Sequence, residues 1–213
     1  MLPWVGISVF CAACGRLNFD PIDDALPPDD GSLPGNGTLV LRDKLAGYTG
    51  TTDTYIDQLA PQVEHHLTTT MPWGGTQQYA LLHFDTLFGP TRIPAGSTIE
   101  SATLRLVLAT ACTGPSVITE IAIGWASTTT WDMFGPLPGV QAGDQRGVPT
   151  MLPTFSVGPA TIDVTPSVAA WSLDPTRNEG WLLSSSQVGC SVLTTESPDV
   201  LQYPELTVEF APP

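Results

Sequence analysis

Four polar side chains near the middle of the chain have the types and the spacing of a ligand-binding surface. Tyr79, His83 and Asp85 lie at odd positions of one apolar run, and Arg105 lies on the polar side of a second run. Because side chains alternate between the two faces of a strand, the members of each set share a face. If the two strands are neighbours, the four groups meet on one sheet surface, where they can bind sugar hydroxyls or a uronate carboxylate. The alternative is a strand face that only contacts solvent.

The same side chains suggest one catalytic alternative. In a polysaccharide lyase, Tyr79 and His83 would act as acid and base while Arg105 neutralises the uronate. The sequence contains no Gly-x-Ser-x-Gly, His-Glu-x-x-His or glycine-rich phosphate-binding motif. We therefore expect a protein without catalytic activity.

The tryptophans divide into one candidate for ligand binding and a group that we expect in the core. Trp73 lies in a Pro-Trp-Gly-Gly turn, where it is a candidate for an exposed platform on which a sugar ring stacks. Trp125, Trp131, Trp171 and Trp181 accompany strand patterns, and a tryptophan body fills a sandwich interior well.

Carboxylates make calcium the metal ion to consider. Small β-sandwich modules often hold one Ca²⁺ for structural reasons through carboxylate and carbonyl oxygens. The candidate ligands are Asp53, Asp57, Asp132 and Glu196, although their positions match no known calcium loop.

Short apolar runs between turns predict the elements that must position these side chains. The 21 prolines and 20 glycines leave little room for long helices, and one helical turn is expected at residues 168–171. We expect residues 117–125 to form a strand whose apolar face carries Ile121 and Ile123, and residues 131–153 to be a long surface excursion. The expected strands are residues 53–57, a short one about 67, 79–85, 102–108, 117–125, 155–157, 161–164, 180–184, 192–195 and 205–210. Such a chain is all-β, an antiparallel β-sandwich that is most simply a jelly roll.

The charge balance limits the classes of partner. Seven Lys and Arg residues stand against 21 Asp and Glu residues, which gives a net charge of −14. A basic face for nucleic acid or an anionic membrane is therefore not expected.

The N-terminal third of the sequence predicts export. Residues 1–13 are signal-like, and Cys11-Ala-Ala-Cys14 is similar to the lipobox of bacterial lipoproteins, in which the last cysteine is acylated. Residues 14–44 are rich in Asp, Pro and Gly, so we expect a disordered acidic tether, with a strand near residues 38–41 as the alternative for its end. Residues 45–213 form the expected sandwich domain. Plain secretion, or an ordinary apolar N-terminus with two free thiols, are the alternatives to a lipid anchor on Cys14.

Export would place the two remaining cysteines in an oxidising compartment. Cys112 and Cys190 are then the pair that is left to form a disulfide. In the chain-entropy view, closing a loop of that length contributes up to about 4 kcal/mol.

Taken in order, the landmarks resemble the DNRLRE-type domain that is grouped with carbohydrate-binding module family 96. The resemblance covers residues 46–211 and rests on the stretches Asp-Thr-Tyr-Ile at 53–56, Ala-Leu-Leu-His-Phe-Asp at 80–85, residues 93–106, Asn-Glu-Gly-Trp-Leu-Leu at 178–183 and Pro-Glu-Leu-Thr-Val at 204–208. It implies a non-catalytic polysaccharide-binding module at the cell surface or outside the cell. A structural surface or matrix protein that acts through protein contacts is the alternative.

Overall fold

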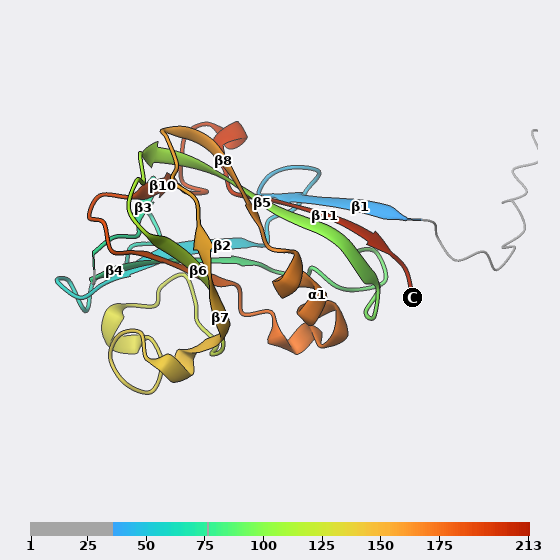
Figure 1. Ribbon diagram of the computed structural model, residues 1–213, viewed down its shortest axis with the longest axis horizontal. Coiled ribbons are helices and arrows are strands. Elements are labelled where there is room, and N and C mark those ends of the chain that lie inside the picture. Colours follow the sequence, from blue (N-terminus) through green and yellow to red (C-terminus); the bar gives the residue numbers. More distant parts are fainter. Residues whose placement is uncertain (1–35, 76) are drawn as a thin grey trace, which may run out of the picture. The chain divides into compact units, whose positions relative to one another are not determined.

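The computed structural model describes residues 36–75 and 77–213, which form two antiparallel β-sheets packed face to face (Figure 1). The all-β antiparallel sandwich expected from the sequence is confirmed. Sheet A contains, in spatial order, β1 (Gly37–Arg42), β11 (Glu205–Ala211), β5 (Thr98–Thr110), β10 (Ser191–Leu193) and β3 (Thr70–Pro72), and β8 (Gly158–Asp163) also pairs with β5. Sheet B contains β2 (Thr51–Asp57), β4 (Gln78–Phe84), β9 (Trp181–Ser185), β6 (Ser116–Ile121) and β7 (Gln145–Leu152).

One core fills the space between the sheets. The alternating residues Leu82 and Phe84 of β4 and Leu104 and Leu106 of β5 all belong to it and are buried. Full burial of one such side chain contributes about 1.5–3 kcal/mol. The apolar faces that the alternation predicts for these two strands are therefore the inner faces of the sandwich.

The two central strands nevertheless lie in different sheets. β4 pairs with β2 and β9 in sheet B, whereas β5 pairs with β11, β10 and β8 in sheet A. Two strands that each have one fully apolar face can bury these faces against each other across the interior, without being neighbours. The connection between them contributes Leu87 and Ile93 to the core, so the chain crosses from one layer to the other at the end of the sandwich.

A second, smaller core covers the outer face of sheet B. It contains Leu81, Ile121 and Leu182 from three strands, and Phe134 from the segment that follows β6. This segment, residues 122–144, runs over the sheet as the yellow loops of Figure 1 and includes two short 3-10 helices, Trp131–Met133 and Ala142–Asp144. Strands β4, β6 and β9 of sheet B are therefore covered on both faces, whereas β7 remains largely exposed.

Several later connections contain short helices. α1 (Thr165–Leu173) contains the expected helical turn and packs against β5, and further 3-10 helices span Pro175–Arg177 and Val200–Gln202. Cys112 and Cys190 form the expected disulfide, with 4.9 Å between their Cα atoms. It joins the chain after β5 to the residue before β10, which pairs with β5.

The structure corrects two assignments made from the sequence. β1 lies inside the expected tether, because Leu39 and Leu41 alternate toward the core and the strand pairs with β11. β7 lies inside the expected excursion, where Gly147 and Pro149 hide its strand pattern. The signal-like segment, Cys14 and the tether up to residue 35 lie outside the described residues. Within the described part, no helix has the length and apolar character needed to cross a membrane.

Candidate functional site

The four polar side chains that the sequence places on one surface do not meet. Tyr79 and His83 lie on the outer side of sheet B, and Arg105 lies on the outer side of sheet A. The expectation of one binding face is wrong for Arg105, because it required β4 and β5 to be neighbours. For the same reason these residues cannot form the acid, base and cation of a lyase.

Arg105 lies in a cross-strand row of charged side chains. Its Nη1 donates to the carbonyl of Leu201 at 3.1 Å, and its strand neighbour is Glu205. Glu205 in turn pairs with Arg42 at 2.8 Å. These contacts join neighbouring strands of sheet A, and they leave Arg105 on its outer face.

Tyr79 is part of the second core. It is half-buried, and its ring lies 6.0 Å from that of Trp131, centroid to centroid. Burial raises the pKa of its phenol. The residue therefore fastens the covering segment to β4 rather than facing solvent.

His83 and Asp85 do come together, in a cavity of about 150 Å³ that Asn178 also lines. Burial lowers the pKa of His83, so the imidazole is neutral near pH 7. Asn178 donates to the carbonyl of Phe84, and its buried Oδ1 has no hydrogen-bond partner within the described residues. The cavity presents acceptors and one neutral imidazole.

Trp73 is not an exposed platform. Its side chain is 0% exposed and belongs to the main core. The turn packs closely against the chain before β10: the amide of Trp73 donates to the carbonyl of Cys190, and a Cβ on Gly74 would lie 2.4 Å from the carbonyl of Gln187. This contact turns the indole inward, and only glycine fits beside it.

The four candidate calcium ligands are bound by other protein groups or lie apart. Asp53 is buried and accepts from the amide of Thr195 at 2.8 Å, and desolvation raises its pKa to about 6. Asp57 accepts from Gln78, and Asp132 accepts from Gln62. Of the other three candidates, Glu196 lies close enough to influence Asp53. In residues 36–75 and 77–213 no three acidic, His or Cys side chains gather as a metal site would need.

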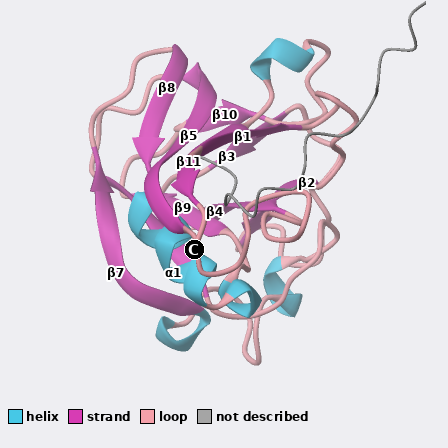
Figure 2. Ribbon diagram, turned by 90° about the vertical axis from the view of Figure 1, so that its right-hand side faces the viewer, coloured by secondary structure: helices cyan, strands magenta, loops and turns pink. Residues whose placement is uncertain are grey.

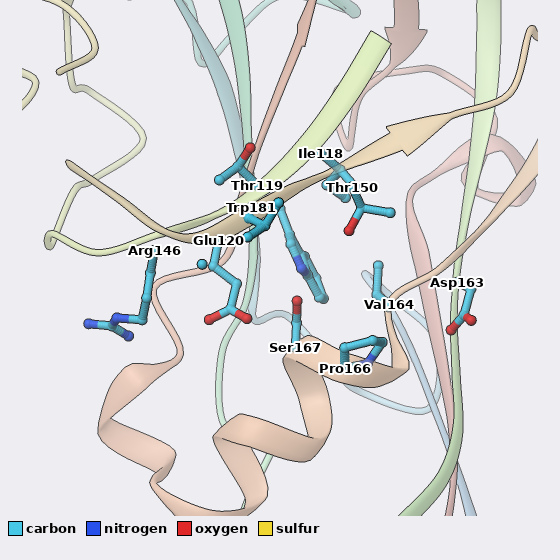
Figure 3. Close-up of a pocket in the computed structure, with 12 residues that line it drawn as sticks. Ile118, Thr119, Glu120, Arg146, Thr150, Asp163, Val164, Pro166, Ser167 and Trp181 are labelled. Carbon is cyan, nitrogen blue, oxygen red and sulfur yellow. The ribbon is translucent and has the colours of Figure 1, made fainter. Parts of the chain in front are cut away.

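A larger cavity, of about 220 Å³, lies between the sheets at one edge of the sandwich. Its walls are the inner side of β6 and β9, the edge strand β7, and the junction between β8 and α1. Figure 2 shows β7 and β8 along the same side of the molecule, with α1 beside them. We call this the Trp181 cavity after the aromatic side chain in its wall (Figure 3).

Trp181 and Glu120 are cross-strand partners on the inner side of sheet B. Trp181 is 1% exposed, and its Nε1 has no hydrogen-bond partner within the described chain. Glu120 accepts from Trp171 Nε1 at 3.2 Å through Oε2, and the same oxygen lies 3.6 Å from a guanidinium nitrogen of Arg177. One wall therefore offers an unused donor and a carboxylate whose other oxygen is unused.

Hydroxyl groups lie on the remaining walls. Ser167, in the first turn of α1, and Thr150, on β7, line the cavity, and Figure 3 shows the Ser167 hydroxyl directed toward the ring of Trp181. Arg146 lies at the rim, where its Nη1 donates to the carbonyl of Arg177 at 3.1 Å. Chemically, the cavity can donate and accept hydrogen bonds around one small polar ligand.

Sequence patterns missed this site for identifiable reasons. Residues 117–125 were expected to form a strand whose apolar face carries Ile121 and Ile123. β6 ends at Ile121, and this face is turned outward: Ile121 is buried in the second core and Ile123 packs against it, so Ile118 and Glu120 point inward. The one available signal was Glu120, the only charged residue of β6, which could have indicated a polar site in the interior. Arg146 and Thr150 lie on β7, which shows no alternation. The expectation that Trp181 belongs to the core is confirmed, and nothing in the sequence showed that this core residue also lines a cavity.

Comparisons with known protein families and with curated proteins found no match: no family model matches the chain, and no curated protein matches it either.

Proposed function

We propose that the chain is a non-catalytic module that binds polysaccharide through the Trp181 cavity. The observation that carries this proposal is the buried indole N–H of Trp181, which has no hydrogen-bond partner within the described residues, in the wall of a cavity that Glu120 and Ser167 also line. A buried donor without a partner costs about 1–3 kcal/mol. A ligand oxygen that accepts from it removes this cost.

Sugars fit the mixture of groups in this cavity. Each sugar hydroxyl both donates and accepts, so neighbouring hydroxyls can accept from Trp181 and donate to Glu120 at once. The resemblance of residues 46–211 to carbohydrate-binding module family 96 supports the same class of ligand. The proposal contains no reaction, since Glu120 is bound by Trp171 and Arg177.

Export and anchoring are part of the same proposal. The Cys112–Cys190 disulfide supports an oxidising compartment, and the Cys11-Ala-Ala-Cys14 sequence supports a lipid anchor on Cys14 at the cell surface. Replacing Cys14 by Ser should release the protein into the medium. Retention of the variant in the membrane fraction would remove the anchor from the proposal.

Binding is tested on an array of neutral and acidic polysaccharides, followed by titration calorimetry. Wild-type protein should bind at least one polymer. Trp181→Phe keeps the ring but removes the N–H, and should weaken binding up to about tenfold, because one hydrogen bond contributes up to about 1.5 kcal/mol.

Two variants outside the cavity provide the control. Arg105→Ala and His83→Ala should leave binding unchanged, whereas a loss of binding in either would return the site to the outer faces of the sheets. Ser167→Ala, at a partly exposed helix position, tests the cavity without disturbing the core if Trp181→Phe unfolds. Failure of wild-type protein to bind any polymer would end the proposal.

A structural module that acts through protein contacts is the second candidate. Edge strand β7 exposes Val148 (89%) and Met151, and Val157 precedes β8 on the same side. Exposed apolar side chains on a strand edge favour contact with another protein. A negative array, together with cross-linking that is lost in Val148→Lys, would support this candidate.

A further inference from the structure

We infer that the Trp181 cavity takes a neutral sugar unit, such as an unsubstituted hexose or pentose, and rejects uronates and sulfated sugars. This inference rests on the proposed function and names the ligand class of the same cavity. Three features of the cavity support it: the charged side chains around it, the protein groups that Arg146 and Arg177 already contact, and its volume.

Two carboxylates lie on different sides of the cavity. Glu120 belongs to the wall formed by sheet B, and Asp163 to the end of β8. Hydrogen bonds from Thr165, first its hydroxyl and then its amide, lower the pKa of the Asp163 carboxyl. The amide donates to Asp163 at 2.9 Å. A sugar carboxylate beside Trp181 would therefore lie against the Glu120 carboxylate, whose paired cation, Arg177, is not among the residues that line the cavity.

The nearby cations are not directed at a ligand that lies beside Trp181. Arg177 pairs with Glu120 and does not line the cavity. Arg146 lines the rim, but its Nη1 is bound by the carbonyl of Arg177, and its guanidinium group points away from Trp181 in Figure 3. A carboxylate placed beside Trp181 would be taken out of water without a cation directed at it, which is strongly unfavourable.

A neutral unit satisfies the same walls. One hydroxyl accepts from Trp181 and another donates to the unused oxygen of Glu120, while Ser167 and Thr150 can act in either sense. A volume of about 220 Å³ is below the range of about 300–1,000 Å³ that is usual for drug-sized ligands. The cavity therefore has room for one sugar unit and not for several.

The test compares polymers that differ in the carboxylate alone. Titration calorimetry measures binding of linear β-1,4-mannan against β-1,4-polymannuronate, and of carboxyl-reduced polygalacturonate against polygalacturonate itself, at 50 mM and 500 mM NaCl. The neutral member of at least one pair should bind at least tenfold more tightly, and its affinity should not change with salt. Equal or tighter binding of the acidic member would overturn the inference.

Glu120→Gln separates this inference from the proposed function. The variant removes one of the two negative charges but keeps the shape, so its preference for the neutral polymer should fall at least threefold. If the acidic polymers bind best and Trp181→Phe weakens that binding, the function stands and the inference fails. If neither variant alters binding of a polymer that wild-type protein retains, the cavity is not the site and both fail.

Discussion

The outer faces of the two sheets differ, although the alternation of apolar and polar residues is similar in both. On sheet B, the outward residues Leu81 and Leu182 are fully buried because Phe134 and its neighbours cover them. On sheet A, the outward residues Val40 and Arg105 remain at least partly exposed. A period of two thus tells which residues share a face, but what covers that face is decided by segments far away in the sequence.

The largest effect is expected when Phe134, the aromatic side chain that covers the outer face of sheet B, is removed. Phe134→Ala should destabilise the domain by about 3–5 kcal/mol, because it leaves a cavity in the second core. Val40→Ala on the exposed face of sheet A should change stability by no more than about 0.5 kcal/mol. Urea unfolding of both variants measures the two values, and equal effects would mean that the covering segment contributes no core.

The pKa of the buried Asp53 carboxyl tests a contact that joins the two sheets. Asp53 of β2 in sheet B accepts from the amide and the hydroxyl of Thr195, which follows β10 in sheet A. Its pKa is raised from 3.8 to about 6, so the folded state binds the proton more tightly than the unfolded state. The free energy of unfolding should therefore fall as pH rises from about 4 to 6, by at most about 3 kcal/mol.

Asp53→Asn provides the matched control for this pH dependence. The difference between wild-type protein and the variant isolates Asp53 from the effect of the overall charge of −14. Urea unfolding at several pH values between 4 and 7 should give a flatter profile for the variant. Parallel profiles would show that the carboxyl titrates normally in the fold.

His83, on the outer side of sheet B, should act in the opposite direction. Burial lowers its folded pKa, so the unfolded state binds more protons just below the ordinary value of 6.5. Stability should fall as pH decreases through that value, and His83→Gln should not show this loss. An unchanged slope in the variant would mean that the imidazole is solvated.

The ion pair on the exposed face should have the smallest effect. Arg42 and Glu205 are 2.8 Å apart and partly exposed, and such pairs contribute about 0.2–1 kcal/mol. A double-mutant cycle with Arg42→Ala and Glu205→Ala in urea should return a coupling in that range. A coupling above about 2 kcal/mol would show that this face is shielded from water as sheet B is.

Sequence patterns predicted the parts of the fold that depend on local alternation. The strands at β2, β4, β5 and β11, the helical turn in α1 and the pairing of Cys112 with Cys190 all follow from residue type and spacing. β7 was missed because Gly147 and Pro149 break its alternation. The partner of each strand was not predictable, since nothing local to β4 or β5 states which sheet it joins.

The candidate site depends on which sheet each of these strands joins. The Trp181 cavity forms where β6, β7, β9 and the β8–α1 junction meet, and these elements, although they follow one another along the chain, belong to two different sheets. The residues expected to bind a ligand were instead distributed between two sheets, a core and a smaller cavity. Residue types alone therefore identified the polar groups but not their neighbours.

The most direct measurement is the ¹H–¹⁵N NMR signal of the Trp181 indole during titration with a polysaccharide retained on the array. Trp73 is the internal control: like Trp181 it belongs to the main core and has a buried indole N–H with no partner within the described residues, but it does not line the cavity. The Trp181 signal should move with saturation while the Trp73 signal stays in place. A polysaccharide that binds and leaves the Trp181 signal unmoved would contradict the assignment of the cavity as the binding site.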